Sequence, residues 1–240
     1  MQMNSCRNCK EPIIGNYCSN CGQPAKLKRI DGQYMIHEIG DFFSANRGMI
    51  YTIKNILIRP GESVRHFIAE NRYRFVKPIT FLFITTLFYA LVGNLFDIKT
   101  SSFTSFSGQE GMVSLLIDWL IEHRGYMLIL VGLFVSFWLK IFFRKVGYNL
   151  FEVFILFCFI FGITMLFNSV AIIIQGITHL KLINISAGIG IIYGVWATVQ
   201  FFDKKKATSY IKTLLSYILG FLTFGILSAV GAIIESAIKQ

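Results

Sequence analysis

The sequence predicts an all-α polytopic membrane protein with about five transmembrane helices, interfacial amphipathic helices and a small N-terminal zinc ribbon. Hydrophobic residues make up 54% of the 240 residues and charged residues only 15%, whereas soluble domains carry about 25% charge. In addition, four cysteines lie in a short polar segment that cannot bury a core of its own. We therefore expect a zinc ribbon at 1–25, a basic linker with amphipathic juxtamembrane helices at 26–77, and a transmembrane helical domain at 78–240.

The cysteines form two C-x2-C pairs separated by eight residues, and their numbers are Cys6, Cys9, Cys18 and Cys21. A C-x2-C turn places two sulfurs on one side of a tetrahedral ion, so we predict that these four residues bind Zn²⁺. Residues 11–17 would form a hairpin between the pairs, with Gly15-Asn16 as its turn. The first 33 residues are polar and contain no secretory signal, which favours the reducing cytoplasm. An iron–sulfur centre or a redox dithiol is the alternative, and the ribbon is either a structural unit or a recognition module.

Two amphipathic helices are expected before the first membrane span. Apolar residues recur at helical spacing over 34–58, with a break near Gly48, and Arg59-Pro60-Gly61 ends this pattern before a second helix at 62–70. Basic residues interleave with aromatic ones over 59–77, and they are Arg59, Arg65, Arg72, Arg74 and Lys77. They suit a site for anionic lipid headgroups, or alternatively an anchor that keeps this segment on the cytoplasmic side.

Five apolar runs are long enough to cross a bilayer, and we place them at 78–96, 125–143, 150–175, 182–202 and 210–234. Residues 112–122 place Ser114, Asp118 and Glu122 at intervals of four and are expected to form an interfacial helix, since a span with two unpaired acids would be costly. With the N-terminus in the cytoplasm, the inner segments hold 19 of the 23 lysines and arginines and the outer segments hold 4. This distribution predicts a cytoplasmic N-terminus and a C-terminus outside.

The spans argue against several functions. They contain no central Asp, Glu, Lys or Arg, which ion-coupled transporters usually need, and no clustered nucleophile and base. The net charge of +10 is concentrated beside the apolar runs, so it indicates a membrane surface and not a nucleic-acid partner.

The order of these motifs resembles a known family. C-x2-C…C-x2-C-G-Q, a basic linker and "RPGE…F…R-x-R…KP" before the first span are similar to an uncharacterised family of bacterial integral membrane proteins. That family is a domain of unknown function with an N-terminal zinc ribbon. The resemblance implies a bacterial inner (cytoplasmic) membrane location and Cys6, Cys9, Cys18 and Cys21 as ribbon ligands, but no activity.

We expect a non-enzymatic scaffold, adaptor or assembly protein of the inner membrane. Its cytoplasmic ribbon would dock an unidentified cytoplasmic or membrane protein partner, and its basic segment would contact membrane lipids, including anionic ones. The alternatives are a small channel or transporter with a path between the glycine-rich fourth and fifth spans, and a membrane enzyme acting on lipid.

Overall fold

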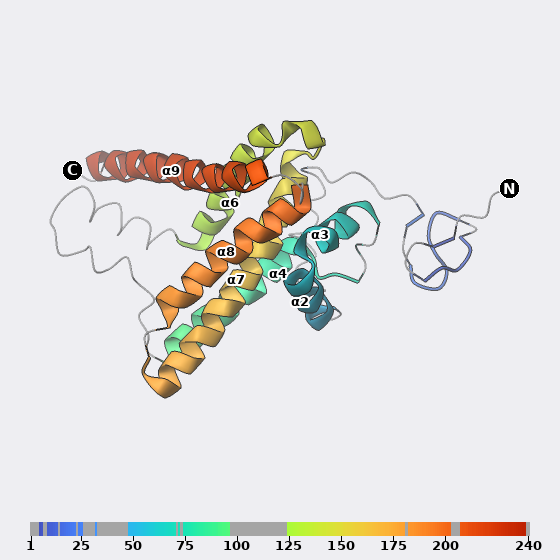
Figure 1. Cartoon of the computed structure of the whole chain (residues 1–240), viewed down its shortest axis with the longest axis horizontal. Helices are drawn as coiled ribbons and strands as arrows, with labels where there is room; N and C mark the ends of the chain where they lie inside the picture. Colours follow the sequence, from blue (N-terminus) through green and yellow to red (C-terminus); the bar gives the residue numbers. More distant parts are fainter. Residues whose placement is uncertain are drawn as a thin grey trace.

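The apolar runs of the sequence form long helices that pack side by side (Figure 1). The computed structural model describes residues 5–6, 9–13, 15–22, 24–25, 32, 48–70, 72, 74–96, 124–180, 182–202 and 207–238. In chain order the elements are α2 (Met49–Ile58), α3 (Pro60–Ala69), α4 (Pro78–Leu95), α6 (Arg124–Phe142), the 3-10 turn η3 (Arg144–Val146), α7 (Leu150–Thr178), α8 (Ile183–Phe202) and α9 (Ala207–Ile238). The expected helix at 112–122, and the part of 34–58 before Gly48, lie outside the described residues.

Within the described residues, four helices are long and apolar enough to cross a membrane: α4, α7, α8 and the Ala207–Gly231 part of α9. They confirm the first, third, fourth and fifth expected spans. The second expected span coincides with α6, whose Ile129–Phe142 part is apolar but shorter. In the part of the chain that the structure describes, the count of full-length candidate spans is therefore four, one fewer than expected.

Local sequence explains where these helices begin. Pro60 and Pro78 occupy the first turns of α3 and α4, where a missing backbone N–H leaves no hydrogen bond unmade. Asn149 and Glu152 form a capping box at the start of α7, each accepting the backbone N–H of the other at 2.8 Å. This pairing explains why an acidic side chain, Glu152, is buried at the end of a membrane-grade helix.

Helix α7 is the centre of the molecule, because residues 152–160 are buried on all sides. Glycines permit its close approach to two neighbours. A Cβ added to Gly162 of α7 would lie 2.5 Å from the ring of Phe81 in α4, and one added to Gly132 of α6 would lie 2.6 Å from the ring of Phe157. Such small residues let helix backbones pack closely in lipid.

One end of the bundle collects segments that are far apart in sequence, and we call it the collar end. Here α3 contacts the last turn of α8, and Phe143, after α6, stacks on Phe202 with ring centroids 4.2 Å apart. At the far end, a Cβ on Gly176 of α7 would meet the ring of Phe96, which follows α4. The chain therefore leaves the collar end along α4 and is back there at the end of α6.

Helix α9 packs mainly on α6 and diverges from the other helices (Figure 1). A Cβ on Gly220 would lie 2.8 Å from Cα and 3.0 Å from N of Val135, so the two backbones are nearly in contact. Lys212 lies over the Phe143 ring and Phe224 pairs with Phe134, which makes α6 and α9 antiparallel. As a consequence, α9 runs from the collar end towards the far end.

Candidate metal centre and basic collar

The four cysteines come together at the N-terminus. Their Sγ atoms all lie within 4.8 Å of one another. Three of the separations are 3.5 Å for Cys6–Cys21, 3.4 Å for Cys9–Cys18 and 3.6 Å for Cys9–Cys21. The two C-x2-C pairs therefore face each other, as the spacing predicts.

Each pair sits on a tight loop closed in the same way. In the first loop, Lys10 N–H donates to Cys6 O at 3.0 Å and Ser5 pairs with Pro12 in an antiparallel bridge. In the second, Gly22 N–H donates to Cys18 O at 2.8 Å and Tyr17 pairs with Pro24. In each loop, the residue after the second cysteine of the pair has a left-handed backbone conformation, with φ of 68° at Lys10 and 71° at Gly22.

The two loops are copies of one motif. Residues 5–12 read SCRNCKEP and residues 17–24 read YCSNCGQP, so C-x-N-C and a proline recur twelve residues apart. The cysteine spacing alone does not reveal this repeat, but the positions of Asn8, Asn20 and the two prolines do. Because the bridges close each loop on itself, the expected hairpin across residues 11–17 is not what the described residues form.

The geometry fits a tetrahedral metal ion. Zinc–sulfur bonds of about 2.3 Å place tetrahedral sulfurs roughly 3.8 Å apart, close to the separations observed. A set of four thiols suits zinc or an iron–sulfur centre better than magnesium or calcium, which prefer oxygen. The four cysteines can therefore hold a metal ion.

The thiols also affect one another's ionisation. A hydrogen bond from the backbone of Glu11 lowers the pKa of Cys9, but desolvation and the thiols of Cys18, Cys21 and Cys6 outweigh it. Together they raise the pKa of Cys9 to about 12. In the absence of a metal, Cys9 is a neutral thiol at physiological pH, and a metal has to displace its proton.

The second expected site, the basic segment, is part of a structure that we call the collar, residues 48–77. Its helices α2 and α3 dock on the collar end of α8. Arg65 donates from Nη1 to the carbonyl oxygens of Gln200 and Phe201 at 2.6 and 2.8 Å, and Tyr193 donates its hydroxyl to Ile56 O at 2.7 Å. The carbonyls that Arg65 caps belong to the last turn of α8, where a cation is favoured.

The collar also has an apolar core. Phe67 of α3 packs against Phe75 and against Phe159 of α7, with ring centroids 6.0 and 5.4 Å apart. A Cβ on Gly61 would lie 2.6 Å from Gln200 O, so α3 approaches α8 at backbone distance. Gly48 has φ of 113° and lies against the backbone of Arg74, and α2 begins at the next residue.

The five basic residues predicted to bind headgroups have different surroundings. Arg65 caps α8, and Arg72 donates from Nη2 to Ile68 O at 3.0 Å. Arg59 has a side chain that is 71% exposed and lies 4.0 Å from Glu62. Arg74 is exposed, and Lys77 is partly buried just before α4. The headgroup site stays a prediction, and Arg59 and Arg74 are its exposed members.

The arrangement defines a class: a helical protein with several membrane-grade helices and a four-cysteine cluster able to bind a metal. The family model described as "Protein of unknown function (DUF3667)" matches residues 46–90, which include α2, α3 and most of α4. The matched segment is thus the collar and the helix that follows it. No curated protein and no solved structure matches the chain.

Proposed function

We propose that this chain is a non-enzymatic membrane adaptor of the bacterial inner membrane, in which the cysteine module binds zinc and presents a docking surface in the cytoplasm. The proposal rests on the exposed aromatic side chain of Tyr17 in the cysteine module, where each loop is closed by its own backbone contacts. Tyr17 is 68% exposed although its neighbour Cys18 is buried in the thiol cluster. Aromatic side chains are enriched at protein interfaces, and a metal site would hold this one on a rigid loop.

The collar supports the same proposal because it anchors the part of the chain that follows the module. Its hydrogen bonds to α8 and its aromatic contacts to α7 join residues 48–77 to the membrane-grade helices. An adaptor needs a membrane anchor of this kind in the same chain as its recognition module. Catalysis would instead require a nucleophile and a base within hydrogen-bond reach in a cleft.

Site-specific photo-crosslinking in intact cells tests the adaptor. A photoreactive residue at Tyr17 should link one stoichiometric partner, and the link should be lost when Cys9 and Cys18 are both changed to Ser. The matched control carries the photoreactive residue at Asn16, its exposed neighbour, with the cysteines intact, and should give the same partner. If neither position links a partner and the purified protein conducts solutes in vesicles, the adaptor proposal is wrong and the channel alternative is favoured.

A further inference from the structure

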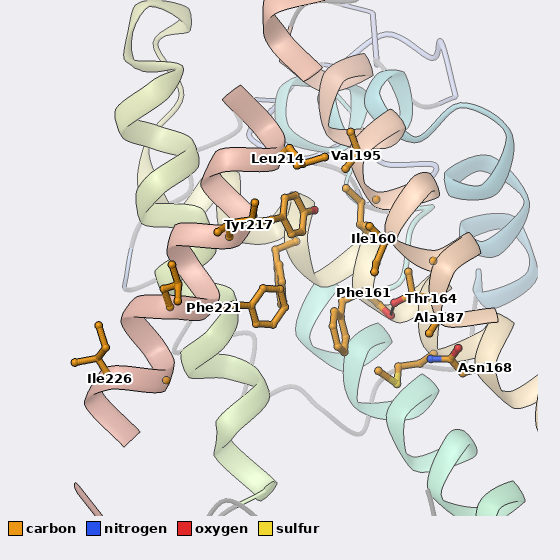
Figure 2. A pocket seen from close by; sticks show the side chains of 18 of the residues that line it. Ile160, Phe161, Thr164, Asn168, Ala187, Val195, Leu214, Tyr217, Phe221 and Ile226 are labelled. Atoms are coloured by element: carbon orange, nitrogen blue, oxygen red, sulfur yellow. Dashed lines mark hydrogen bonds between the residues drawn. The ribbon is translucent and has the colours of Figure 1, made fainter. Parts of the chain in front are cut away.

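A cavity of about 900 Å³ lies between α7, α8 and α9 (Figure 2). Tyr217 and Phe221 of α9 point into it from one side, and Ile160, Phe161 and Thr164 of α7 face them. We infer that this cavity holds an acyl chain of a membrane phospholipid. The inference is independent of the metal site and goes beyond the adaptor function.

The interior of the cavity is apolar because its few polar groups are already paired at the walls. The Tyr217 hydroxyl lies 3.2 Å from Thr198 Oγ1, and Thr164 donates to Phe161 O at 2.7 Å. Asn168 accepts a hydrogen bond of 2.6 Å from Ser186. Water and ions would gain few partners here, whereas hydrocarbon would lose nothing by entering.

The cavity opens on the surface that would face lipid. Among its lining residues, Ile191 is 67% exposed, Leu222 is 55% exposed and Ile226 is 63% exposed. All three belong to helices that are long and apolar enough to cross a membrane. The surrounding medium would therefore be acyl chains, which can enter sideways between α8 and α9.

The length of the cavity suits an extended acyl chain. Its α9 wall runs from Leu214 to Ala229, 16 residues that span about 22 Å of helix at 1.5 Å per residue. One leaflet of a hydrocarbon core about 30 Å thick measures about 15 Å, so an acyl chain can lie along this wall over its whole length.

Collapse of the helices cannot simply remove the space. The near-contact of Gly220 with the Val135 backbone holds α9 on α6, away from α7 and α8. On the cavity side the space is open at two glycines: a Cβ on Gly225 would meet nothing within 4 Å, and one on Gly194 would lie 3.5 Å from Ile160 and 3.6 Å from Tyr217 Oη. The gap is therefore built into the packing.

The test uses the full chain in phosphatidylcholine–phosphatidylglycerol vesicles that contain a phospholipid with a diazirine in one acyl chain. After illumination, mass spectrometry maps the labelled residues. Ile160 is only 3% exposed and is reached through the cavity, whereas Ile155, on the same helix, is fully buried and does not line it. We expect label on Ile160 at least fivefold above that on Ile155.

Two glycine variants make the result specific. Gly225→Phe fills the cavity and should lower the label on Ile160 at least threefold. Gly188→Phe adds the same ring where a Cβ meets nothing within 4 Å, outside the lining, and should leave the label unchanged. Equal label on Ile160 and Ile155 in the unmodified protein would overturn the inference whatever the variants do, and this is also the result expected if a helix of a second copy fills the cavity.

Discussion

Arg65 caps the end of α8, although the sequence predicts that it binds lipid headgroups. Its two hydrogen bonds to the α8 carbonyls are charge-assisted, and each bond of this kind contributes about 1.5–3 kcal/mol. Arg65→Met should therefore lower the free energy of unfolding by roughly 2–4 kcal/mol. Thermal unfolding of the purified protein in detergent measures the change.

The matched control for Arg65 is Arg59→Met, because Arg59 is exposed and its ion pair with Glu62 is long at 4.0 Å. Its effect should stay within about 0.5 kcal/mol. If both variants unfold at the same temperature, the cap on α8 does not stabilise the fold.

The four cysteines act as a unit, so two of them suffice for a test. Purified protein should carry about one zinc per chain, and the Cys9→Ser, Cys18→Ser double variant should carry almost none, since a pair of ligands holds the ion too weakly to order the loops. Elemental analysis by mass spectrometry gives the stoichiometry. Cys158→Ser, which changes the buried cysteine of α7, is the control and should keep its zinc. Iron in place of zinc would mean a different centre.

At the scale of elements, the collar combines two roles that can now be separated. A triple change of Arg65, Arg72 and Arg74 would disturb backbone hydrogen bonds as well as any lipid contact. Changing only the exposed Arg59 and Arg74 to Gln tests the headgroup site with the docking intact. If the site exists, native mass spectrometry should show less co-purified anionic lipid, because each surface cation contributes about 1 kcal/mol. An unaltered lipid profile would leave the collar as an anchor.

The α6–α9 pair depends on a single close approach. Gly220→Leu should force the helices apart and destabilise the protein by about 1–3 kcal/mol or more, since the added atoms meet the Val135 backbone. Gly188→Leu places the same side chain in open space and should be nearly neutral or slightly stabilising. The comparison is made by thermal unfolding in the same detergent, and equal melting temperatures would contradict the packing.

Local rules predicted several elements. The helix start at Pro78 was expected from proline chemistry, and the C-x2-C spacing predicted that four thiols come together. Pro60 was expected to end the preceding helix, and it is also the first residue of α3, two positions before the expected start. What the sequence could not reveal depends on residues that are distant along the chain. Arg65 and Gln200 are 135 positions apart, and the cavity is lined by three helices, one of which, α9, packs on α6 through Gly220. Neither fact has a signature within one helix.

For the whole molecule, the contacts at the collar end bear on the number of membrane crossings. Three segments meet there: residues 48–77, the segment after α6 and the last turn of α8. Four described helices have the length and apolarity of a span, and a return along the shorter apolar part of α6 would make five crossings. Five is also the number that the distribution of basic residues predicts.

A reporter active only in the cytoplasm tests this topology. Five crossings with a cytoplasmic N-terminus predict activity when the reporter is fused after Lys205 and none after Gln240. If α6 does not cross, the two results are reversed. A reporter fused before Gly48 is the control and should be active in either case.

The docking of α3 on α8 also sets an order of events during synthesis. Gly61 and its partner Gln200 are separated by 139 residues. A ribosome adds about 5–20 residues per second, so roughly 7–30 s pass between the emergence of one and of the other. During this interval Val64 and Phe67, which are fully buried in the finished protein, lack part of their cover. The collar can close only when α8 has been inserted, which makes its closure one of the last steps in the biogenesis of the protein.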